Sequence, residues 1–194
     1  PSRRVMPFLK ARVMPWISLI VVAALLAWLI WKACSVTAVT VAATDPCAGG
    51  VPCAPTAAGA AVFDTRSACF ATNINLEAGK RYRFSVAPLD AWVDGDIPAG
   101  PAGIAGSAAP WWMPLAVPFR RAWREPWYTL MGSTGCDGQK PFAIGAGLDK
   151  HQIENAGRLH LFVNDAVCSL CPGGVWHYYK NNRGTARVTV TPID

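Results

Sequence analysis

The sequence has few of the residues on which enzyme active sites most often depend. Only three histidines occur among its 194 residues, and none falls in a nucleophile or metal-ligand motif: His151, His160 and His177. Closely spaced acids are confined to the loop at residues 90–96. No helical pattern follows the glycines of residues 132–147, which excludes a phosphate-binding loop there. We therefore expect a protein that is not an enzyme.

Acids are also absent from residues 1–12, which carry four basic residues. Residues 13–31 then run for 19 positions without a charge, and about 20 such residues make one membrane-spanning helix. Only Lys32 follows this run closely. Because basic flanks stay in the cytoplasm, the pattern predicts a cytoplasmic flank at 1–12, a transmembrane helix at 13–33 in the cytoplasmic membrane, and a periplasmic remainder. A cleaved signal peptide is the alternative, although its apolar core is usually shorter.

The cysteines agree with an oxidising compartment such as the periplasm. Residues 34–60 are expected to form a linker with a first strand at 35–44 and a cysteine loop, followed by the main domain at residues 61–194. We expect three disulfides and one leftover cysteine: Cys47–Cys53, Cys69–Cys136, Cys168–Cys171 and Cys34. A four-thiolate zinc site or a redox pair is an alternative use of the same residues. The prolines and glycines around them favour loop disulfides.

Alternation of apolar and polar residues with a period of two predicts an all-β main domain. It runs through residues 158–164 and again through residues 185–191. Between these strands lie Asp165, at the end of the first, and Asn181 and Asn182, just before the second. If the two strands pair antiparallel, the three side chains meet at one end of a sheet. Carboxylate and amide oxygens are hard ligands, and hard ligands suit calcium.

The stretch around these residues resembles a known family. The run Phe162–Asp165, a glycine-containing loop, and the run Tyr178–Gly184 before a Val-Thr-Val strand are similar to the calcium-dependent galactose-binding lectins of the PA-IL type. The resemblance implies a small, jelly-roll-like β-sandwich with a calcium ion that binds sugar hydroxyls. It also implies the ligands of that ion: side-chain oxygens of Asp165, Asn181 and Asn182, the Tyr178 carbonyl, and a backbone oxygen from residues 92–95.

Other residues near this motif bear on the expected calcium site. The loop at residues 90–96 brings three acids toward the same end of the domain, and Asp94 among them is a candidate metal ligand. The sequence departs from the family pattern at residues 168–173, which look inserted, and at Lys180 and Arg183, which add positive charge. Asn-Asn-x-Gly is also ordinary turn chemistry, which is the structural alternative to a metal site.

A segment rich in proline and tryptophan precedes this motif. Residues 97–118 contain five prolines, which exclude a regular helix or a central strand. Aromatic residues and arginines interleave just after it, and we expect a surface that contacts anionic headgroups or a partner subunit. Its predicted members are Trp111, Trp112, Arg120, Arg121, Trp123 and Arg124. The alternative is that the tryptophans cap one end of the sandwich while the arginines are solvated.

Two functions fit these features. The one we expect first is an accessory subunit of a larger membrane complex, for example photosynthetic or respiratory, with integral membrane subunits and the lipid bilayer as partners. The alternative is a membrane-anchored, calcium-dependent carbohydrate-binding module with a glycan as its ligand. Nucleic acid is not expected as a partner, because the net charge of +6 includes the basic flank and the main domain lies outside the cytoplasm.

Overall fold

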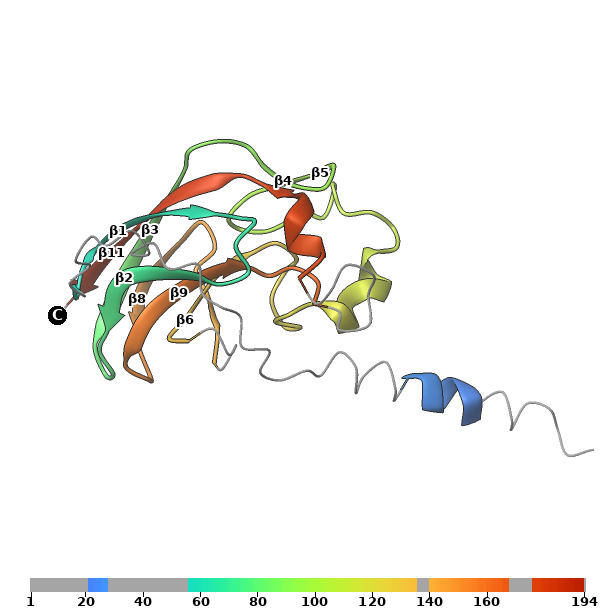
Figure 1. Ribbon diagram of the computed structural model, residues 1–194, viewed down its shortest axis with the longest axis horizontal. Helices are drawn as coiled ribbons and strands as arrows, with labels where there is room; N and C mark the ends of the chain where they lie inside the picture. The colour runs from blue at the N-terminus through green and yellow to red at the C-terminus, as the bar shows by residue number, and fades with distance from the viewer. Residues whose placement is uncertain (1–20, 28–55, 136–139, 168–175, 194) are drawn as a thin grey trace, which may run out of the picture.

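The computed structural model describes residues 21–27, 56–135, 140–167 and 176–193 (Figure 1). Residues 21–27 are helical, and no helix within the described residues is long and apolar enough to cross a bilayer. The rest of the transmembrane helix expected over residues 13–33 lies outside the described residues. The strand expected at residues 35–44 does so as well.

Two four-stranded antiparallel sheets form the body of the domain. The first contains, in spatial order, β1 (Gly59–Asp64), β11 (Thr185–Ile193), β3 (Arg81–Pro88) and β8 (Gly147–Gln152). The second contains β2 (Phe70–Leu76), β9 (Gly157–Val163), β6 (Leu130–Ser133) and β7 (Phe142–Ala143). Buried residues of both sheets form one apolar cluster, so the sheets pack face to face as a sandwich (Figure 1).

The order of pairing is that of a jelly roll. Strand β1 pairs with β11, β2 with β9, β3 with β8, and β6 with β7. The chain is therefore folded like one long hairpin whose two arms are distributed between two sheets. This confirms the expected β-sandwich. The conditional pairing of residues 158–164 with 185–191 is wrong, because β9 and β11 lie in opposite sheets.

Alternation along these strands places apolar side chains in the core, as their sequence period predicts. In β11, Ala186, Val188 and Val190 are buried. In β9, the buried set includes Leu159 and Leu161. The inward faces assigned from the sequence are therefore confirmed, although Phe162 on the other face of β9 is buried as well and the conditional pairing of the two strands was wrong. Period two determines which side of a strand faces inward but carries no information on its neighbour.

Smaller elements cover one end of the sandwich. A three-stranded sheet contains β10 (Asn182–Arg183), β4 (Trp92–Asp94) and β5 (Ile97–Ala99), in that order. Two short 3-10 helices, η1 (Met113–Phe119) and η2 (Tyr178–Asn181), lie at the same end, away from the C-terminal end of β11 (Figure 1). Pro98 lies on β5, an edge strand, and η1 is not an α-helix. The proline-rich segment thus contains neither a regular α-helix nor a central strand, as expected.

A glycine between β10 and β11 allows two backbone segments to approach closely. Gly184 has a φ of +129°, and a Cβ atom built on it would lie 2.5 Å from Cδ1 of Trp92 and 2.9 Å from its Cα atom. The Trp92 indole nitrogen donates to the Thr185 carbonyl at 3.0 Å. The three-stranded sheet is therefore held against the first sheet at a point that only glycine fits.

We predict that Gly184→Ala lowers the free energy of unfolding by roughly 1–3 kcal/mol, because the added methyl group overpacks this contact. Chemical denaturation of the purified variant measures the loss. Gly106→Ala is the matched control, since no atom lies within 4 Å of the position of its Cβ. Equal stability of the two variants would contradict the prediction.

Candidate functional site

Four polar side chains meet at the covered end of the sandwich, and we call them the acid–amide cluster: Asp94, Asp165, Asn181 and Asn182. The register of the small sheet places Asn182 opposite Asp94. Helix η2 ends at Asn181 and continues directly into β10. Asp165 follows the last residue of β9 by two positions. Three separate segments of the chain thus bring their oxygen atoms to one place.

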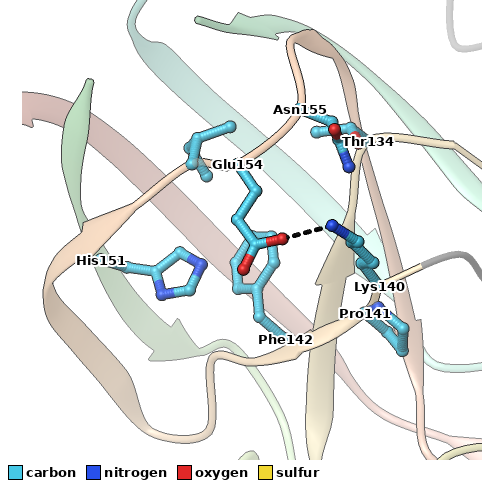
Figure 2. Close-up of a pocket in the computed structure, with 8 residues that line it drawn as sticks. Thr134, Lys140, Pro141, Phe142, His151, Glu154 and Asn155 are labelled. Atoms are coloured by element: carbon cyan, nitrogen blue, oxygen red, sulfur yellow. Dashed lines mark hydrogen bonds and ion pairs between the residues drawn. The ribbon is translucent and has the colours of Figure 1, made fainter. Parts of the chain in front are cut away.

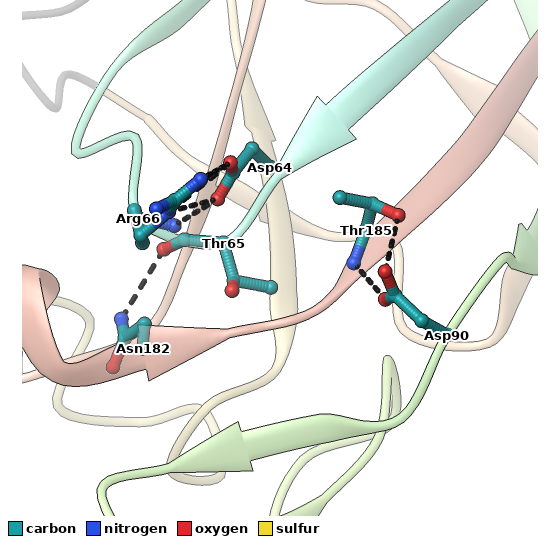
Figure 3. Close-up of polar contacts among 6 residues, drawn as sticks. All are labelled: Asp64, Thr65, Arg66, Asp90, Asn182 and Thr185. Carbon is teal, nitrogen blue, oxygen red and sulfur yellow. Dashed lines mark hydrogen bonds and ion pairs between the residues drawn. The ribbon is translucent and has the colours of Figure 1, made fainter.

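The amide of Asn182 links two of these segments. Its Nδ2 atom donates to Asp165 Oδ2 at 2.9 Å. The same atom donates to the Thr65 carbonyl at 3.2 Å (Figure 3). Both partners are acceptors, so the orientation of the amide is determined by the network. The other end of the amide, Asn182 Oδ1, is buried and has no donor among the described residues, and the same holds for Thr65 Oγ1.

The two carboxylates of the cluster also lack a compensating cation. No basic side chain within the described residues forms an ion pair with Asp94 or Asp165. Burial, reinforced by the charge of Asp165, raises the pKa of Asp94 to about 7, although a hydrogen bond from the Asn181 amide at 3.4 Å opposes the shift. Burial also raises the pKa of Asp165, against hydrogen bonds from Asn182 and the Ala166 backbone.

The donor set of this cluster fits a hard cation such as calcium. It offers two carboxylates whose charges repel each other and a buried amide oxygen without a donor. Buried polar atoms without partners are rare in folded proteins, so each one needs an explanation. A cation would satisfy the amide oxygen and balance the carboxylates, and oxygen ligands of these types are those that calcium takes. No cluster of three histidine, cysteine or acidic residues occurs in the described part of the chain.

A cavity of about 600 Å³ opens beside the cluster. Asp94, Asp165 and Asn181 contribute its polar wall. The opposite wall is apolar and comes largely from η1 and the residues before it: Pro110, Met113, Ala116 and Phe119. These four residues are spaced by three, and side chains three apart eclipse each other in a 3-10 helix. The three-residue period therefore aligns them in one stripe along the cavity.

The structure brings most of the predicted metal ligands together. Asp165, Asn181, Asn182 and Asp94 form the cluster, and Tyr178 lines the adjoining cavity. The sequence did not indicate Thr65, whose carbonyl binds an amide 117 residues further along the chain. No local pattern could have found it, because the contact depends on the packing of two sheets.

The two other acids of the 90–96 loop have structural contacts. Asp90 accepts hydrogen bonds from the backbone nitrogen of Thr185 at 2.5 Å and from its hydroxyl at 3.0 Å (Figure 3). It therefore holds the start of β11. Asp96 is exposed and lies 4.0 Å from the guanidinium of Arg183. Of the three acids in this loop, Asp94 alone joins the cluster.

The predicted contact residues divide into two groups. Trp111, Trp112 and Trp123 have exposed fractions of 85%, 45% and 64%, and Arg124 is also exposed. Arg120 and Arg121 instead pack within the domain. The Arg121 guanidinium lies 3.7 Å from the ring centroid of Phe162 and donates to the Ala68 carbonyl at 2.5 Å, and that of Arg120 lies 5.5 Å from the Trp127 ring.

Among the cysteines, Cys69 lies in the described part of the chain, where it is buried and disulfide-bonded. Its predicted partner, Cys136, lies outside the described residues. So do the other predicted pairs, Cys47–Cys53 and Cys168–Cys171, together with Cys34. The alternative zinc site falls in the same undescribed segments.

A second cavity, of about 490 Å³, lies between β7 and the end of β8 (Figure 2). Its carboxylate, on Glu154, already pairs with Lys140 at 2.6 Å. The His151 ring stacks on Phe142 with 4.2 Å between centroids and an angle of 26° between planes. The carboxylate of this cavity is therefore neutralised by a lysine, in contrast to those of the acid–amide cluster.

Comparison with known proteins found several solved structures of similar fold, and one of them is a lectin domain. The chain is similar to the EclA N-terminal domain, described as a PllA-like lectin, with 18% identity and a TM-score of 0.47 over 69% of this chain and 95% of that one. No family model matches the sequence, and no curated protein matches it. We base no functional step on this likeness and rely instead on the geometry of the cluster.

The raised pKa of Asp94 predicts how the cation-free protein responds to pH. Its folded-state pKa of about 7 exceeds the ordinary value of 3.8, so the folded state holds the proton more tightly. The resulting stability is complete below about pH 4 and is lost as the pH rises through about 7. We expect urea unfolding in a chelator to show higher stability at pH 4 than at pH 8.

The variant Asp94→Asn isolates this effect. It should flatten the pH dependence and make the cation-free protein more stable than wild type at pH 8, by about 1–3 kcal/mol, because one pKa unit corresponds to about 1.4 kcal/mol. Glu77→Gln, at an exposed position before β3, is the control for loss of one surface carboxylate. An unchanged slope in Asp94→Asn would show that another group titrates.

Proposed function

We propose that this protein is a calcium-dependent carbohydrate-binding module rather than an enzyme. The observation that carries the proposal is the convergence of the Asp94 and Asp165 carboxylates on an open cavity. Asn182, which is hydrogen-bonded to Asp165, adds a buried amide oxygen without a partner among the described residues. The lectin resemblance of the sequence around Asp165 and Asn181 leads to the same function. We further propose that the module is anchored in the cytoplasmic membrane and faces the periplasm, as the basic flank and the uncharged run of the sequence predict.

In this proposal the acid–amide cluster holds the ion. Asp94, Asp165, Asn181 and Asn182 supply side-chain oxygens, and the Tyr178 carbonyl is a further candidate ligand. A bound calcium ion accepts hydroxyl oxygens at the coordination positions that the protein leaves open. The protein residues bind and orient the ion, and their burial restricts its contact with water.

The cavity beside the cluster suits a sugar. Carbohydrates present hydroxyl groups on their edges and C–H groups on their faces, and the cavity offers both kinds of wall. Asp96 and Asn181 line its polar side, whereas Trp112 and Tyr178 contribute exposed aromatic rings against which a sugar face can pack. Galactosides are the first ligands to test, because the resembling lectins bind galactose.

The membrane-complex role expected first from the sequence is not part of this proposal. It would need a surface shaped for an integral membrane subunit, and no observation on the described residues favours such a subunit over other partners. The exposed tryptophans of that prediction are considered separately below.

Calcium binding is tested by thermal unfolding at pH 8 with added calcium or chelator. A ligand that binds only the folded state at 100 times its Kd stabilises it by about 2.7 kcal/mol, so the wild type should show a clear rise in Tm. Asp94→Asn and Asp165→Asn should each lose most of that rise. Asp149→Asn should keep it, because this side chain pairs with Arg83 on the outer face of the first sheet. No calcium response in the wild type would refute the metal site.

Sugar binding is tested by calorimetric titration with galactosides in calcium and in chelator. Trp112→Ala should weaken sugar binding about tenfold, as expected for loss of a stacked ring worth about 1.4 kcal/mol, while leaving the calcium-induced rise in Tm unchanged. If the protein binds calcium but no sugar on a glycan array, the metal site is supported and the proposed lectin function is refuted.

A further inference from the structure

Three apolar side chains project into solvent beside the cavity, and we call them the tryptophan tip: Trp111, Leu115 and Trp123. Their exposed fractions are 85%, 74% and 64%. Soluble monomers rarely leave large apolar side chains this exposed in one region, and contiguous apolar patches usually mark a binding surface. The proposed sugar site does not use these three side chains, which are absent from the cavity lining.

The geometry of η1 explains why the tip cannot fold back into the domain. Met113 is only 5% exposed, and its stripe of residues lines the cavity. Leu115 lies on a different stripe of the 3-10 helix and is absent from the cavity lining. The helix is thus fixed by its inner stripe, and Leu115 is held in solvent.

The third member of the tip is tied to the end of this helix. Arg120 is the C-cap residue of η1, and its guanidinium donates to the Trp123 carbonyl. The Asn164 side chain binds the backbone nitrogen of Ala122 at 2.7 Å and lies within 3.0 Å of the Ala122 and Pro126 carbonyls. Trp123 therefore sits in a turn fastened to the sandwich.

The charge next to the tip in the sequence is mostly positive. Residues 97–119 contain no charged side chain, and residues 120–125 contain three arginines and one acid, Glu125. Arg120 and Arg121 pack within the domain, so the exposed arginine beside the tip is Arg124. Arg124 is exposed, and its guanidinium lies 4.9 Å from the Trp123 ring centroid. Tryptophan and arginine side chains together suit the boundary between anionic headgroups and acyl chains.

The backbone of the tip is also suited to an apolar environment. Three prolines between residues 110 and 118 have no N–H group to desolvate. The backbone nitrogens of Met113, Leu115 and Arg120 already donate to the carbonyls three residues before them. Unpaired backbone groups are costly in hydrocarbon, so this pairing allows the tip to enter an apolar environment.

We propose that the tryptophan tip rests in the interface of an anionic lipid bilayer and so holds the cavity mouth close to the membrane surface. This inference does not depend on calcium or sugar binding. It concerns the folded domain and does not depend on whether the N-terminal apolar run inserts into a membrane.

The experiment measures tryptophan quenching by brominated lipids in the full-length protein bound to vesicles of phosphatidylglycerol and phosphatidylcholine. The emission of wild type minus that of Trp111→Phe isolates Trp111, independently of the tryptophans in the N-terminal run. We expect this difference emission to fall by about half or more when the lipids are brominated, because an interfacial indole lies against the acyl chains. Vesicles of phosphatidylcholine alone should quench it less.

A second variant pair tests the rest of the surface. Leu115→Ser combined with Trp123→Ser should reduce the quenching of Trp111, whereas Val62→Ser should not, since Val62 is 51% exposed on the edge strand β1. Unquenched Trp111 emission in anionic vesicles would overturn the proposal. So would protection of Trp111 from aqueous acrylamide without lipid, since that would show a protein surface, such as a second copy of the chain, covering the tip.

Discussion

A hydrogen bond between two buried side chains, Asn182 and Asp165, joins β10 of the three-stranded sheet to the segment that follows β9 of the second sheet. It closes the end of the sandwich and holds a carboxylate in a poorly solvated place beside Asp94. A buried polar network that is only partly satisfied is unfavourable for stability. The chain nevertheless keeps an amide oxygen without a donor there. Violations of this kind are concentrated at functional sites, where a ligand completes the network.

The sequence predicted the strands better than their neighbours. The period of two in β9 and β11 identified both strands and their inward faces correctly. It could not show that they lie in different sheets, since pairing depends on contacts between distant segments. The ligand set was nevertheless brought together, because both strand ends reach the same end of the sandwich. Thr65 could not be found, because its contact with Asn182 exists only after the sheets have packed.

In the proline-rich segment, the composition excludes an α-helix but allows a 3-10 helix. Its prolines rule out an α-helix, yet a short 3-10 helix accommodates Pro114 and Pro118. Its period of three then aligns one stripe of side chains along the cavity, whereas Trp111 and Leu115 lie off that stripe and are exposed. The sequence indicated that the tryptophans were too apolar for an idle loop, but it did not reveal this helix.

The pairing of β1 with β11 also has a consequence for how the protein is made. Strand β11 lies between β1 and β3, so β1 has no partner in its sheet, and β3 has only β8, until residues 185–193 have been synthesised. Contacts of such long sequence separation are slow to form. Meanwhile the free edges of β1 and β3 are open to other chains. The acid–amide cluster needs Asn181 and Asn182, so it cannot form before that stretch of the chain has been made.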